Sequence, residues 1–90
     1  MINSAGRWDL QVDASVIKTL ETFPRHDVER IDKIIGLLGN DPFFGDIKKM
    51  KGEGNIWRRR IGAYRLFYKL DVSVKTIFVF HVERRTSSTY

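Results

Sequence analysis

Two β-strands and the tight turn between them are encoded in one stretch of the chain, Trp57-Arg58-Arg59-Arg60-Ile61-Gly62-Ala63-Tyr64-Arg65-Leu66-Phe67-Tyr68. Apolar and charged residues alternate on both sides of Gly62-Ala63, and this period of two is typical of strands with one buried face. We expect strands over residues 56–62 and 64–71. If one face of this strand pair is buried, the opposite face carries Arg58, Arg60, Arg65, Phe67 and Lys69.

The remaining elements follow from periodicity and from residues that begin or end helices. We expect strands over residues 8–12 and 76–82, and helices over residues 14–22 and from His26 or Asp27 to Leu38. Residues 43–55 read as a loop, held to the core by its aromatic residues. The order β-α-α-β-β-β predicts an α/β fold with a helix hairpin packed on a small, mainly antiparallel sheet. With 90 residues, we expect a single domain over residues 1–90.

The helix hairpin is expected to cover one face of this sheet, which leaves the charged face of the two central strands uncovered. Arg59 does not fit this pattern, because it falls on the apolar side together with Trp57 and Ile61. We expect it near the edge of the sheet, with its aliphatic stem along apolar neighbours.

Positive charge is concentrated in the half of the chain that carries the predicted strands. Residues 48–85 hold eleven of the sixteen Lys and Arg residues against three acidic residues, a formal charge of +8. Residues 1–47 hold five basic and eight acidic residues, a formal charge of −3. A basic sheet with interleaved aromatic residues is typical of proteins that bind polyanions, RNA above all. A solvated basic face that keeps a small domain in solution is the simpler alternative; we favour nucleic acid or the ribosome.

The composition also excludes several kinds of site. The chain has no cysteine, which excludes disulfides, thiolate metal sites and a cysteine nucleophile. Its two histidines and scattered carboxylates show no ligand spacing, so we expect no metal and no other cofactor. Apolar runs such as residues 77–80 are too short to span a membrane, and the first residues lack the apolar run of a signal peptide. We therefore expect a cytoplasmic protein.

Three motifs follow one another along the chain: Asn40-Asp41-Pro42 before a loop rich in Gly and Lys, the stretch over residues 57–68, and Val82-Glu83-Arg84-Arg85 ahead of the final Tyr90. With the length, the element order and the basic sheet, these motifs resemble the RelE/ParE superfamily of bacterial toxins from toxin–antitoxin pairs. The resemblance covers nearly the whole chain. It implies the α/β fold of that superfamily and a cognate antitoxin protein as partner.

The superfamily has two activities, so the resemblance alone does not decide the function. RelE-like members cut mRNA in the decoding site of the ribosome, whereas ParE-like members poison DNA gyrase and need no nuclease residues. The terminal arginine and tyrosine favour the RelE-like branch. On this reading the chain is a metal-independent endoribonuclease that acts on mRNA at the ribosome and blocks translation. The alternatives are a ParE-like gyrase inhibitor and a basic RNA-binding protein without activity.

RNA cleavage through the 2′-hydroxyl needs a proton acceptor, a proton donor for the leaving 5′ oxygen, and cations around the phosphate. By resemblance, Arg65 and Arg84 stabilise the phosphate charge, and Tyr90 assists deprotonation or stacks on a base. The residues expected to contact phosphate or ribosomal RNA are Arg58, Arg60, Lys48, Lys49, Lys51 and Lys69. Phe67 is the candidate for base stacking.

Two positions depart from the RelE-like pattern. Lysines that often precede the arginine-rich strand are replaced here by Asn55-Ile56, and the often basic position before Arg84 is Glu83. Because an arginine hardly releases its proton, the general acid is left unassigned. His81 is a candidate by its chemistry. Strand parity groups it with Ile77 and Val79, however, so we expect it to pack within the strand.

Overall fold

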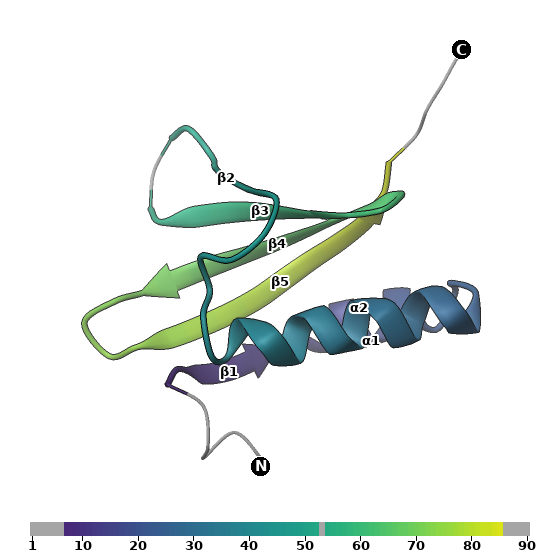
Figure 1. Cartoon of the computed structure of the whole chain (residues 1–90), viewed down its shortest axis with the longest axis horizontal. Helices are drawn as coiled ribbons and strands as arrows, with labels where there is room; N and C mark the ends of the chain where they lie inside the picture. Colours follow the sequence, from purple (N-terminus) through teal and green to yellow (C-terminus); the bar gives the residue numbers. More distant parts are fainter. Residues whose placement is uncertain (1–6, 53, 86–90) are drawn as a thin grey trace.

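The computed structural model describes residues 7–52 and 54–85. Two helices and five strands follow one another in these residues (Figure 1). Their order and bounds are β1 (Asp9–Val12), α1 (Ala14–Leu20), α2 (Arg25–Leu38), β2 (Ile47–Lys49), β3 (Ile56–Ile61), β4 (Tyr64–Asp71) and β5 (Thr76–Arg84). The predicted α/β fold, with helices on a mainly antiparallel sheet, is confirmed.

The five strands form one sheet in the order β1-β5-β4-β3-β2. β3, β4 and β5 make the predicted antiparallel meander, and β1 pairs with β5 in parallel. β2 was not predicted, because residues 43–55 read as a loop. It pairs antiparallel with β3 through only three residues, and such a short edge strand is stabilised by its partner and leaves no alternating pattern of its own.

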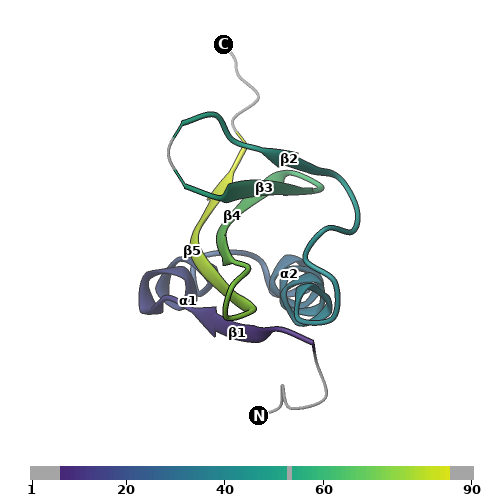
Figure 2. The ribbon, with the colours of Figure 1, turned by 90° about the vertical axis from the view of Figure 1, so that its left-hand side faces the viewer.

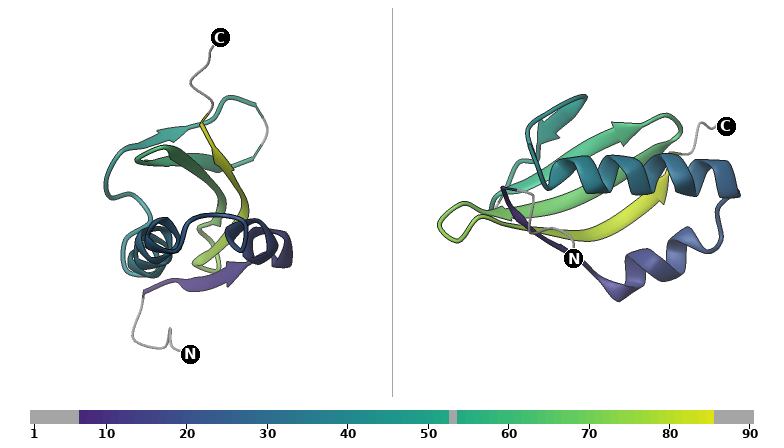
Figure 3. Two further views of the ribbon diagram at one scale, coloured as in Figure 1. Left: turned by 90° about the vertical axis from the view of Figure 1, so that its right-hand side faces the viewer. Right: turned by 60° about the horizontal axis from the view of Figure 1, so that its bottom comes forward.

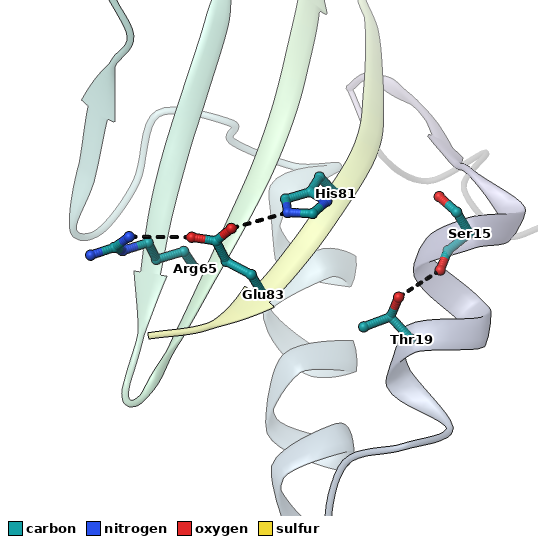
Figure 4. A network of polar contacts seen from close by, with 5 residues as sticks. All are labelled: Ser15, Thr19, Arg65, His81 and Glu83. Carbon is teal, nitrogen blue, oxygen red and sulfur yellow. Dashed lines mark hydrogen bonds and ion pairs between the residues drawn. The ribbon is translucent and has the colours of Figure 1, made fainter. Parts of the chain in front are cut away.

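The two helices take different positions relative to the sheet. Asp13 caps α1, since its carboxylate accepts a hydrogen bond from the backbone amide of Ser15 at 3.0 Å. α1 lies beside β5, and α2 lies against one face of the sheet, in front of the strands in the right-hand view of Figure 3 and behind them in Figure 4. Figure 2 shows β1 next to both helices, with β2 and β3 at the far end of the twisted sheet. In the described residues, no helix is long and apolar enough to span a membrane.

The core lies between the sheet and the helices. The sheet contributes the inward alternate residues of β3, β4 and β5, and the helices contribute Val16, Leu20, Ile31, Ile35 and Leu38. The phenol of Tyr68 donates a 2.6 Å hydrogen bond to the buried carbonyl of Pro42, which attaches the loop after α2 to the sheet. The central part of the inward face of the sheet is therefore used for packing.

Arg59 lies on this inward face, as the alternation predicted, and it is buried instead of reaching the solvent at an edge. Its guanidinium donates a 3.0 Å hydrogen bond to the carbonyl of Phe44 and stands 4.3 Å from the centre of the Phe44 ring. Gly45 has a φ of +86°, and a Cβ there would collide with the Arg59 guanidinium. Arg59 therefore anchors the loop before β2.

Candidate functional site

The face of the sheet turned away from α2 is here called the open sheet face (Figure 4). No helix covers it in the part of the chain that the structure describes, and its side chains are half-buried or exposed. It carries Lys48 of β2, Arg58 and Arg60 of β3, Arg65, Phe67 and Lys69 of β4, and Phe78, Phe80, His81 and Glu83 of β5. The structure thus brings together the five residues that alternation predicted for one face.

Cations gather on the half of the open sheet face that β2, β3 and β4 form. Lys48 is opposite Arg58 across one strand pair, and Arg60 is opposite Arg65 across the next. Like charges directly opposite each other destabilise a sheet unless an anion joins them. Asp46 supplies a distant partner, with a carboxylate oxygen 3.8 Å from Nε of Arg60. The arrangement is suited to a ligand with several negative charges.

Aromatic rings gather on the β5 half of the open sheet face. The Phe67 ring centre lies 6.5 Å from that of Phe80 and 5.5 Å from that of His81, and Phe78 and Phe80 are 6.4 Å apart. Rings at these distances form a continuous apolar strip. Beside a row of cations, this strip offers stacking surface to unpaired bases.

The expectation that His81 packs within its strand is wrong. The register between β4 and β5 shifts between Phe67 and Tyr68, so that β5 contains a β-bulge. A bulge inserts one residue and reverses the alternation beyond it. Val82 is consequently buried and His81 faces the open side, with 52% of its side chain exposed. The sequence carried one signal of this bulge: a titratable residue stands at an apparent core position, and a valine follows it at an apparent surface position.

Arg65, Glu83 and His81 form one polar network at the junction of the two halves (Figure 4). One carboxylate oxygen of Glu83 accepts a hydrogen bond from Nη1 of Arg65 at 3.2 Å, and the other lies 3.1 Å from Nε2 of His81. Arg65 comes from β4 and the other two from β5. The side chains of Arg65 and Glu83 are 35% and 38% exposed, so a ligand on this face would reach all three.

Two arginines, Arg84 and Arg85, stand at the end of β5. Arg84 lies opposite Tyr64 in the register between β4 and β5, on the inward side. Arg85 follows β5, and its backbone amide donates a hydrogen bond to the carbonyl of Ala63. Its Nε is buried and has no hydrogen-bond partner among the described residues. Of the residues predicted for catalysis, Arg65 lies on the open sheet face, Arg84 does not, and Tyr90 lies outside the described residues.

Tyr64 and Tyr68 have structural partners on the inward side. The Tyr64 phenol donates a 2.6 Å hydrogen bond to Asp27 of α2, and this bond, with burial, raises its pKa. Burial raises the pKa of Tyr68 to about 12. A phenol with a raised pKa is ionised to a smaller extent at neutral pH, so less of it is available as a base. These two tyrosines are therefore unsuited to deprotonation on the open sheet face.

The lysines predicted to bind phosphate are divided by the edge of the sheet. Lys48 points to the open sheet face, whereas its neighbour Lys49 pairs with Trp57 on the opposite side. Lys51 follows in the loop. The three lysines, Met50 and Arg58 line a hollow of about 290 Å³ at the edge of the sheet. No group of acidic or histidine side chains within residues 7–52 and 54–85 has the geometry of a metal site.

Comparison with known proteins gives one family and a set of relatives. Residues 7–88 match the family described as the ParE toxin of type II toxin–antitoxin systems, parDE. The chain is 26% identical over 82 residues to RelE1 of Methanocaldococcus jannaschii, covering 88% of this chain and 91% of that protein.

Two solved complexes contain chains of similar fold. One chain belongs to the archaeal RelE–RelB complex of Pyrococcus horikoshii OT3, with a TM-score of 0.79, 23% identity, and coverage of 90% of this chain and 98% of that one. Another belongs to the RelB–RelE antitoxin–toxin complex of Methanococcus jannaschii, with a TM-score of 0.69, 29% identity, and coverage of 82% and 88%.

Proposed function

Because this chain belongs to the ParE toxin family of type II toxin–antitoxin systems, we propose that it arrests growth as a ribosome-dependent mRNA endonuclease of the RelE kind. The observation that carries this proposal is the open sheet face, where cations and aromatic rings flank Arg65. A gyrase inhibitor needs a binding surface, but it does not need a phosphate-binding arginine within a polar network. The similarity to RelE proteins supports the same choice.

The proposed reaction is attack of an mRNA 2′-hydroxyl on the adjacent phosphorus. Arg65 binds the phosphate oxygens through its planar guanidinium and stabilises the charge that grows on them. A second cation comes from Arg84, or from its neighbour Arg85, at the end of β5. By resemblance, Tyr90 completes the site by assisting deprotonation or by stacking on a base.

The rest of the open sheet face holds the nucleic acid. Lys48, Arg58, Arg60 and Lys69 contact phosphates of mRNA or ribosomal RNA, with Lys49 and Lys51 at the edge of the sheet. Phe67 provides the stacking surface for a base, and its position between the cations and the β5 rings favours that role. Phosphate contacts of this kind set affinity and position, whereas the stacked bases influence which codon is cut.

We further propose a cognate antitoxin as the protein partner. Solved relatives include complexes of RelE with RelB, which supports such a partner here. A basic surface is best covered by an acidic segment that folds on binding. We place the apolar part of that segment in a groove of this chain between α1 and α2. The groove is about 310 Å³ in volume and is lined by Ile17, Leu20, Phe23 and Val28 among others.

The second candidate is inhibition of DNA gyrase without chemistry, favoured by the description of the matching family as ParE. Induced cells separate the two functions by the process that stops first. After induction, amino-acid incorporation should stop before thymidine incorporation, and the Arg65→Ala variant should leave both running. If DNA breaks appear first while translation continues, the gyrase function replaces the nuclease function.

A further inference from the structure

The proposed cleavage needs a group that protonates the leaving 5′ oxygen, and the cations around Arg65 do not supply one. A guanidinium keeps its proton at any physiological pH, and a lysine gives up its proton only well above neutrality. Histidine is the side chain whose ordinary ionisation lies closest to neutral pH. On the open sheet face, His81 is the histidine, and the bulge in β5 turns it outward.

The geometry around His81 is that of an oriented proton donor. Nε2 is 3.1 Å from one oxygen of Glu83, while the other oxygen of Glu83 receives the hydrogen bond from Arg65. One carboxylate therefore fixes the imidazole ring and the guanidinium in the same small area. A carboxylate held at Nε2 fixes the orientation of the ring, so that Nδ1 is the nitrogen left to donate a proton. The Phe67 ring, 5.5 Å from the imidazole, borders the pair on the β4 side.

From this geometry, and resting on the proposed nuclease function, we infer that His81 is the general acid of the cleavage and that Glu83 is its positioning residue. The bond between the 2′ oxygen and phosphorus forms while the bond from phosphorus to the 5′ oxygen breaks. The 2′ proton passes to a water molecule, and the imidazolium proton passes to the 5′ oxygen. The products are a 2′,3′-cyclic phosphate and a free 5′-hydroxyl, and solvent then reprotonates the ring.

The other candidate proton donors among the described residues fit this role less well. The two carboxylate oxygens of Glu83 are already engaged, one with Arg65 and the other with His81. His26 belongs to α2, on the opposite side of the sheet, where it pairs with Asp27. Tyr64 and Tyr68 are occupied on the inward side. A histidine kept only for packing would also be buried, whereas about half of the His81 side chain is exposed.

The test uses ribosomes programmed with a short mRNA whose cut site has been mapped with the unsubstituted protein. One substrate carries the natural 5′ oxygen at that bond, and the other carries sulfur in its place. A thiolate leaves without protonation, because thiols are much stronger acids than alcohols. For His81→Gln, we expect the natural substrate to be cut about 100-fold more slowly or worse, and the sulfur substrate to be cut at the unsubstituted rate.

Two further variants complete the design. His26→Gln is the matched control, because it removes the other histidine from an exposed position away from this face, and it should cut both substrates normally. Glu83→Gln should also slow the natural substrate more than the sulfur one, but by less than His81→Gln; a purely structural role of Glu83 would slow both equally. Normal cutting of the natural substrate by His81→Gln, or equal loss on both substrates, overturns the inference and leaves the nuclease function standing. No cutting by the unsubstituted protein overturns the nuclease function itself.

Discussion

Replacement of Lys69 by alanine tests whether the open sheet face binds a nucleic-acid backbone. Lys69 is exposed on β4 and makes no ion pair among the described residues, so its loss should leave the fold intact. Lys33 is the matched control, since it is an exposed lysine on α2, on the opposite side of the sheet. Both substitutions lower the net charge equally, and only Lys69→Ala removes a cation from the proposed binding surface.

The size of the effect follows from the cations on that surface. The face carries Lys48, Arg58, Arg60, Arg65 and Lys69, and carboxylates already pair with Arg60 and Arg65. For single-stranded RNA, each neutralised phosphate contributes about 0.7 to the slope of log affinity against log salt. Three to five contacts give a slope from about −2 to −3.5. Affinity would then fall roughly 16- to 130-fold between 50 and 200 mM salt.

The assay is fluorescence anisotropy with a short labelled RNA across this range of salt concentration. Lys69→Ala should make the slope shallower by about 0.7, whereas Lys33→Ala should keep the slope of the unsubstituted protein. Thermal unfolding of both variants checks that neither has lost its fold. If the two variants have equal slopes, or if binding is insensitive to salt, the open sheet face is not the backbone-binding surface.

Four further substitutions have definite expected outcomes. Arg65→Ala and Tyr90→Phe should each lower ribosomal mRNA cleavage by about 100- to 1,000-fold while antitoxin binding persists; cleavage and growth arrest that survive Tyr90→Phe would remove the hydroxyl from the mechanism. Ile17→Glu places a charge in the groove between α1 and α2, where Ile17 is 50% exposed, so it should weaken antitoxin binding in calorimetry without slowing cleavage; unchanged antitoxin affinity would exclude the groove. Tyr68→Phe leaves the Pro42 carbonyl without its donor and should cost about 1–3 kcal/mol of unfolding free energy in urea titrations. Because the folded protein raises the pKa of Tyr68 to about 12, this phenol ionises at a lower pH in the unfolded chain than in the folded one. The stability that Tyr68 contributes below about pH 10 should therefore be lost as the pH rises toward 12. In the Tyr68→Phe variant, the unfolding free energy should fall less over this pH range. A pH dependence equal to that of the unsubstituted protein would contradict this role of Tyr68.

Most of the fold and part of the site could be predicted from local patterns. Alternation over residues 56–71 identified the two central strands and the five residues that they place on the open sheet face. Asp13 was recognisable as a helix cap, and helical spacing identified the buried stripe of α2. These features depend on residues that are close to one another in the sequence, which is why local patterns predict them.

The features that escaped prediction depend on contacts between distant segments. β2 exists because β3 offers it hydrogen bonds, and the burial of Arg59 depends on the carbonyl and ring of Phe44. The bulge in β5 has the largest consequence, because one inserted residue moves His81 and Glu83 onto the open sheet face. Strict alternation cannot anticipate such an insertion, although the order His81-Val82 contained a hint.

On the function that we propose, the chain cuts mRNA at the ribosome. The most direct measurement is primer extension on a defined mRNA incubated with the purified protein, with and without ribosomes, beside a gyrase supercoiling assay on the same preparation. We expect new mRNA ends only when ribosomes are present, and unchanged supercoiling. Intact mRNA in both reactions, together with loss of gyrase supercoiling, would contradict the claim.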